Sequence, residues 1–177
     1  MSEIFHRAIE PNDAVHLYKW LSVANNNISS FYLSQHIIRK SLEAGSYNSD
    51  PNCYLVFETN NQPIGLGMIT SIDRSRRNCE ITVTVNDVTD NEYEIERIIA
   101  YELLRICFEE FSMHRVYTCT YENVLDRENL WRSLGAVLEV TERQGVFRMG
   151  RFWDKSIFSV LITEWIGSQV TSEATNE

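Results

Sequence analysis

Apolar residues alternate with polar ones in the middle of the chain, and this period of two predicts strands. It covers residues 53–58, 63–72 and 78–85. Asn60 and Asn61 separate the first two segments, and asparagine tolerates the positive φ that a tight hairpin turn requires. The three segments therefore predict a meander of strands at the centre of a sheet.

The third of these strands has two chemically different faces. Apolar side chains occupy the odd-numbered positions from Cys79 to Val85, and polar side chains occupy the even-numbered positions from Glu80 to Thr84. Because successive side chains of a strand point to opposite faces, we expect Glu80 to lie on the face away from the core.

Apolar residues spaced three and four apart predict helices on both sides of the meander. The first helix begins at Pro11, where Asn12 or Asp13 can cap it, and Gly45 ends the second. The later predicted helices are 30–43, 91–111 and 126–134. The remaining predicted strands are 5–9, 114–121, 136–140, 146–149 and 152–162. In the helix at 126–134, Asp126, Arg127 and Glu128 are interpreted as a solvated start.

The order of elements predicts an α/β (α+β) fold, in which helices cover a mixed, mostly antiparallel central sheet. Residues 5–166 are expected to form a single domain, followed by a polar tail at 167–177. The chain has 177 residues, of which 44% are hydrophobic and 23% charged, as is typical of a soluble globular domain.

Composition narrows the classes of partner. The 25 acids outnumber the 16 bases, and the resulting net charge of −9 argues against nucleic-acid binding. No apolar run is long enough for a membrane span, and the N-terminus lacks the apolar core of a secretory signal. We therefore expect a cytoplasmic protein. The four cysteines and four histidines show no metal-ligand spacing, so no metal site is expected.

Several passages together resemble one enzyme family. The passages are FHRAIEPNDAVHLYKWL near the N-terminus, QPIGLGMITSID, CFEEFSMHRVYTCTYENV, LWRSLGAVLE and QGVFRMGRFWDKSIFSVLITEW. In order and spacing they resemble the GNAT superfamily of acetyl-CoA-dependent N-acyltransferases, and most of all the branch of the ribosomal-protein N-acetyltransferases. The resemblance covers about residues 5–166 and implies a GNAT-like sheet, with a glycine pair (Gly65 and Gly67) on the substrate side.

The resemblance also implies a cofactor site. In the family, acetyl-CoA lies in a wedge between two splayed strands, and its pantetheine pairs with a strand backbone, here that of Val83, Thr84 and Val85. Its pyrophosphate lies at the N-terminus of the next helix, on a loop of the form Q/R-x-x-G-x-G/A. Ile95 lies within the matching segment, and Arg97 is the nearby base that could hold a phosphate. The family's cofactor-binding asparagine falls on Val124 by ungapped spacing, and a shift of one residue places it on Asn123.

The matching segment departs from the family pattern. The loop falls on residues 91–96, where Glu94 and Glu96 replace the two small residues. No glycine occurs between Gly67 and Gly135, and carboxylates near a phosphate repel it. Trp131 matches the position of the family's tyrosine general acid, and an indole N–H does not serve as a proton donor at ordinary pH.

Glu80 matches the position of a catalytic glutamate in some family members and is the candidate base that deprotonates the acceptor amine. The alternative is a solvated Glu80 that pairs with Arg76 or Arg77. The resemblance implies acetyl transfer to a primary amine of a peptide or protein N-terminus, a polyamine or an aminosugar, and homodimers are common in the family. The second hypothesis is a GNAT-fold pseudoenzyme that acts as a binding or interaction module.

Overall fold

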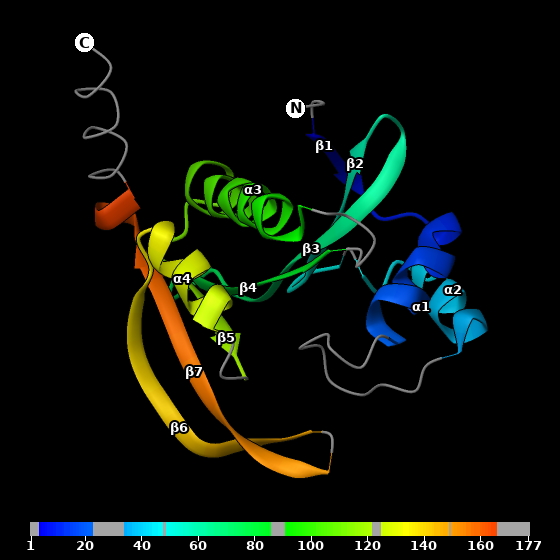
Figure 1. The fold of residues 1–177 in the computed structure, drawn as a ribbon. Coiled ribbons are helices and arrows are strands. Elements are labelled where there is room, and N and C mark those ends of the chain that lie inside the picture. The colour runs from blue at the N-terminus through cyan, green and yellow to red at the C-terminus, as the bar shows by residue number, and fades with distance from the viewer. Residues whose placement is uncertain are drawn as a thin grey trace.

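The structure is a computed structural model, and its central feature is a seven-stranded mixed sheet (Figure 1). It describes residues 4–22, 34–47, 49–85, 91–121, 125–148 and 150–165. Within these ranges the strand order is β1-β2-β3-β4-β5-β7-β6. Only β4 and β5 are parallel, and the other neighbours are antiparallel, as the sequence predicts.

The elements follow the predicted order. The strands are β1 (Ile4–Ala8), β2 (Cys53–Thr59), β3 (Gln62–Asp73), β4 (Asn78–Val85), β5 (Arg115–Thr120), β6 (Val137–Arg148) and β7 (Arg151–Leu161). The helices are η1 (Pro11–Asp13), α1 (Ala14–Ser22), α2 (Gln35–Glu43), α3 (Glu92–Arg105), η2 (Ile106–Glu110) and α4 (Leu125–Ser133). No helix in these described ranges is both long and apolar enough to cross a membrane.

Residues in several turns have the positive φ that asparagine and glycine tolerate. Asn60 and Asn61 have φ of 49° and 61° in the β2–β3 turn. Gly45, Gly135 and Gly150 have φ between 72° and 83°, in the left-handed region that glycine enters without strain.

Two predicted boundaries are wrong. The helix expected over 91–111 ends as an α-helix at Arg105 and continues as the π-helical segment η2, in which the Phe111 amide donates to the Ile106 carbonyl. Residues 106–108 are all buried, so their hydrophobic pattern has no periodicity that could distinguish a π-helix from an α-helix. The strands expected at 136–140 and 146–149 are a single strand, β6, whose bulges accommodate the polar residues between them.

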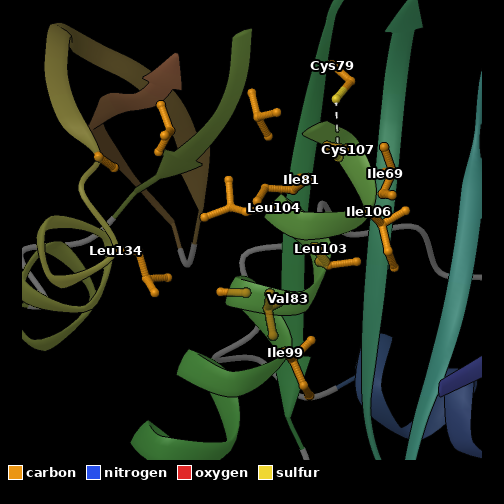
Figure 2. Packing of buried hydrophobic residues seen from close by; sticks show 14 of the residues in the cluster. Ile69, Cys79, Ile81, Val83, Ile99, Leu103, Leu104, Ile106, Cys107 and Leu134 are labelled. Carbon is orange, nitrogen blue, oxygen red and sulfur yellow. Dashed lines mark hydrogen bonds between the residues drawn. The ribbon is translucent and has the colours of Figure 1, made fainter. Parts of the chain in front are cut away.

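Two apolar clusters place helices on both faces of the sheet. The larger lies beneath α3 and α4, where Ile81, Val83, Leu103 and Leu104 pack together (Figure 2). The smaller joins α1 and α2 to the opposite face of β2 and β3, around Leu66. The two helix pairs therefore leave the opposite face of β4 and β5 without a described helix over it (Figure 1).

The glycine pair of β3 faces α3, and its place on the substrate side stays a prediction. A Cβ on Gly65 would lie 2.7 Å from Cδ1 of Ile99, and one on Gly67 would lie 2.8 Å from Cδ2 of Leu103. Both neighbours belong to α3. The glycines therefore allow α3 to approach the sheet closely, which is a packing role.

Candidate active site

The parallel strands β4 and β5 separate after a short paired segment. They pair at Asn78–Glu80 with Arg115–Tyr117. Beyond this point the described part of β4 pairs with β3, and β5 pairs with β7. The β5-facing backbone edge of β4, from Ile81 to Val85, is therefore left open in a wedge whose vertex is the Glu80–Tyr117 pair.

Buried side chains fill the wedge near its vertex on the side of α3 and α4. Ile81, Leu104, Thr118 and Trp131 line this space together with Phe158 and leave no room for a water molecule. Figure 2 shows Ile81 and Leu104 close together at this point. Trp131 is only 4% exposed. The residue that replaces the family's tyrosine is thus part of the core.

Glu80 lies on the opposite, half-open face. Its strand neighbours Cys79 and Ile81 are buried beneath α3, whereas Glu80 is half-buried beside Tyr117 and Cys119 of β5. The Cys119 thiol lies close enough to the Glu80 carboxylate for the two groups to interact electrostatically. The predicted orientation of Glu80 is consistent with this burial pattern.

The arginines proposed as alternative partners of Glu80 have other contacts. Arg76 Nε lies 3.8 Å from the Asp73 carboxylate, and Arg77 Nε donates to the Ser112 carbonyl at 2.7 Å. The side chains that lie beside Glu80 are instead the Tyr117 phenol and the Cys119 thiol.

Two neighbours of Glu80 are held in their protonated forms. Burial, followed by the nearby Glu80 charge, raises the pKa of Cys119 to about 12. Burial and then Glu80 also raise the pKa of Tyr117, against a smaller lowering by a hydrogen bond with Ser71. At neutral pH Cys119 is therefore a thiol and a poor nucleophile.

Two ion pairs occupy the N-terminal half of α3. Arg97 Nε lies 3.2 Å from Glu94 Oε2 on the helix surface. Arg127 Nε, on α4, lies 3.7 Å from Oε1 of Glu96. Glu96 is only 7% exposed, and burial raises its pKa, with Arg127 opposing the rise. The interpretation of Arg127 as part of a solvated helix start is therefore wrong, because its side chain is 21% exposed and faces α3.

The predicted cofactor residues divide into four groups, of which Arg97 is the one already described in its pair with Glu94. Val83, Thr84 and Val85 belong to the part of β4 that lies beyond its pairing with β5. The amide of Ile95 already donates to the Asn91 carbonyl at 3.1 Å. Only the partly buried side chain of Ile95 is therefore left to contact a cofactor. Asn123 lies outside the described residues.

Tyr117, Cys119, Ser71 and Arg127 are site residues that sequence reasoning missed. The alternation of 115–120 could have placed Tyr117 and Cys119 on one face, but it carries no information on which strand lies next to them. Among the described residues, no group of three or more His, Cys, Asp or Glu side chains is arranged to hold a metal ion.

Comparison with known proteins identifies the fold. No family model and no curated protein matches the sequence. Among solved structures, spermidine N-acetyltransferase from Vibrio cholerae in complex with CoA and spermine aligns with a TM-score of 0.83 at 17% identity, over 92% of this chain and 98% of that one. A chimera of the Vibrio cholerae enzyme SpeG with hSSAT gives 0.85 at 18% identity, over 93% and 99%. A probable acetyltransferase gives 0.78 at 21% identity, over 92% and 94%.

These likenesses cover nearly the whole of both chains, and at such identities they establish the fold. The chain has the GNAT fold, with a mostly antiparallel sheet flanked by helices. The ribosomal-protein branch suggested by the sequence stays a prediction.

Proposed function

We propose that the protein is an N-acetyltransferase that transfers an acetyl group from acetyl-CoA to a primary amine. The observation that carries this proposal is the separation of β4 from β5 immediately beyond Glu80. It combines an open strand edge on which an amide-bearing chain can pair with a carboxylate at the point where the two strands part.

In this proposal the open edge of β4 holds the cofactor. Backbone groups of Val83, Thr84 and Val85 pair with pantetheine amides, as a neighbouring strand would. Ile95 supplies an apolar contact at the start of α3, and Arg97 and Asn123 are further candidates for binding. Acetyl-CoA supplies the activated acetyl group as a thioester.

Glu80 would act as the general base. An amine attacks only when its nitrogen lone pair is free, so the ammonium form must first lose a proton. Glu80 lies on the face that α3 and α4 leave open, where an acceptor can approach it directly or through a water molecule. Because Cys119 is held as a thiol, the proposal is direct transfer to the amine, without an acyl-cysteine stage.

The acceptor we propose first is a polyamine, with a peptide N-terminus and an aminosugar as further candidates. A net charge of −9 attracts cationic acceptors. The likeness to a spermidine N-acetyltransferase observed with CoA and spermine supports the same choice.

The test is a CoA-release assay with acetyl-CoA and a panel of spermidine, a peptide with a free N-terminus and glucosamine. Glu80→Gln should lower kcat by roughly a hundredfold, as expected for loss of a general base, and the loss should be smaller at high pH, where the amine is already deprotonated. Glu109→Gln, an exposed carboxylate on η2, is the matched control. Equal turnover of Glu80→Gln and the wild type would remove Glu80 from the mechanism.

The second candidate is a GNAT-fold binding module without catalysis. Trp131 favours it, because this buried indole stands where the family uses a tyrosine. Thermal unfolding with acetyl-CoA and with desulfo-CoA separates the candidates, since a ligand at about a hundred times its Kd stabilises a protein by about 2.7 kcal/mol. Absence of stabilisation by either ligand at millimolar concentration would contradict the acetyltransferase proposal. Stabilisation without turnover of any amine would favour the binding module.

A further inference from the structure

A second cavity, separate from the wedge, lies between the edge strand β1 and α3. β1 is the first strand of the sheet, and α3 lies beside it (Figure 1). The cavity has a volume of about 350 Å³, which falls in the range of about 300–1,000 Å³ that small-molecule sites occupy. None of the described residues that line it belongs to the wedge. It is therefore a candidate site of its own.

The cavity exists because of where α3 docks. Ile99 and Leu103 of α3 lie close to the two glycines of β3, so this face of the helix is held against the middle of the sheet. Ile98, Tyr101 and Glu102 are spaced three and four apart and form the neighbouring stripe of the same helix. This stripe lines the cavity above β1 and β2. The helix therefore presents one apolar, one aromatic and one acidic side chain to the same space.

The opposite wall of the cavity is aromatic. His6 and Phe57 are partners in the β1–β2 ladder, and their ring centroids lie 5.6 Å apart. On the helix side, the Tyr101 ring is held by packing against the Trp165 ring, with centroids 4.9 Å apart. Aromatic ring faces carry negative charge density and attract cations. The rings of this cavity therefore favour a positively charged ligand.

Carboxylates make one end of the cavity negative. Oε1 of Glu102 lies 3.2 Å from Nε2 of His6 and accepts from Arg105 at 2.7 Å. The bonds from Arg105 lower the pKa of Glu102, so this carboxyl is ionised at neutral pH. Arg105 also pairs with Glu109 and Glu110, at 3.3 and 2.8 Å. Three carboxylates thus share one guanidinium, and their excess negative charge lies beside the cavity.

We propose that this cavity is a second binding site, which takes a small organic cation with an apolar, aromatic body. The body packs against Ile4 and Ile98, and the positive group lies against the Tyr101 ring and near Glu102. An anion is repelled by the carboxylates, and a cation charged along its whole length would bring desolvated charge against the two isoleucines. The inference goes beyond the proposed function and does not depend on it, because the two sites share no residue.

The test is an NMR titration of the ¹⁵N-labelled full chain with benzyltrimethylammonium, a cation with no N–H that could be acetylated. Saturable amide shifts should centre on β1, Phe57 and the second half of α3, with a Kd of about 0.1–1 mM. Glu102→Gln keeps an acceptor for Arg105 but removes the charge, and it should weaken binding about tenfold. Glu92→Gln, in the exposed first turn of α3, is the matched control and should bind as the wild type does.

Uncharged benzyl alcohol and anionic phenylacetate test the role of charge. Both should bind the wild type at least about tenfold more weakly than the cation, and Glu102→Gln should not weaken benzyl alcohol further. Ile98→Trp fills the cavity and should abolish the shifts in a protein whose thermal unfolding shows it to be folded. This variant tests the site even where Glu102→Gln fails to fold.

Three results would overturn the inference. The first is the absence of saturable shifts up to about 10 mM cation. The second is equal affinity for benzyl alcohol and the cation, which would show an apolar cavity without selection for charge. The third is a set of shifts centred on Glu80 and Tyr117 that disappears in Glu80→Gln, which would place the cation at the proposed acceptor site. None of these results bears on acetyl transfer, which the CoA-release assay tests separately.

Discussion

At the scale of single residues, Gly65 and Gly67 of β3 differ in how easily their surroundings could make room for a larger side chain. The Cβ of an alanine at position 65 would lie 2.9 Å from the Thr84 carbonyl oxygen, which is fixed in the β3–β4 ladder. At Gly67 the closest atoms are the ends of the Phe57 and Leu103 side chains. A side chain can move within the core more easily than a paired strand can.

Gly65→Ala should therefore destabilise the protein by roughly 1–3 kcal/mol, and Gly67→Ala by less. Because Thr84 lies between Val83 and Val85, a shift of β4 caused by Gly65→Ala should also weaken the proposed pantetheine binding at the other edge of this strand. Urea unfolding and calorimetry measure the two effects. Equal costs at the two positions would show that the side chains around Gly67 are as rigid as the strand.

At the scale of elements, one buried carboxylate connects β1, β2 and the start of the first helix. Arg7 donates to both oxygens of Asp13, at 2.7 and 2.9 Å, and to Glu58 at 2.7 Å. The Glu10 amide also donates to Asp13 at 2.7 Å. Burial acts to raise the pKa of Asp13, but the bonds from Arg7 and Glu10 outweigh it, and the pKa is lowered overall.

The direction of this shift predicts a pH dependence. A carboxylate whose pKa is lower in the folded state stabilises the fold above its ordinary value of 3.8, and this stabilisation is lost as the pH falls below that value. Asp13→Asn should cost about 1–3 kcal/mol at neutral pH and progressively less towards about pH 3. Urea unfolding across this range measures the difference, with Glu43→Gln on the surface of α2 as control. A cost independent of pH would show that the geometry of the cap, and not its charge, is what matters.

At the scale of the whole molecule, the net charge of the protein and the charge of the proposed cofactor are both negative. The protein carries −9 and CoA is a polyanion, so the charge of the whole molecule repels the proposed cofactor as it approaches. Screening shortens the range of this repulsion from about 30 Å at 0.01 M salt to about 8 Å at 0.15 M.

The association rate constant of CoA should therefore rise as salt is added over this range. Stopped-flow measurements of tryptophan fluorescence can record it, and uncharged pantetheine, whose rate should stay constant, is the control. A rate that falls with added salt would show that a local positive field at the binding site outweighs the net charge of the molecule.

The sequence by itself determined the order of the elements, the β2–β3 turn at Asn60 and Asn61, and the two faces of β4. These features depend on backbone preferences and on periodicity within a few neighbouring residues, which each segment carries wherever it lies. For the same reason the expectation that Glu80 lies off the core face could be made before its neighbours were known.

Only the tertiary structure decided which residues meet across elements. The pairing of Glu80 with Tyr117, the side of the sheet on which Gly65 and Gly67 lie, and the contact of Glu96 with Arg127 each depend on strand register or helix docking. Long-range packing sets these, because the same local pattern is compatible with several partners. The physical reason is that periodicity records whether a side chain is buried, whereas the identity of its neighbour is fixed only when the whole chain is folded.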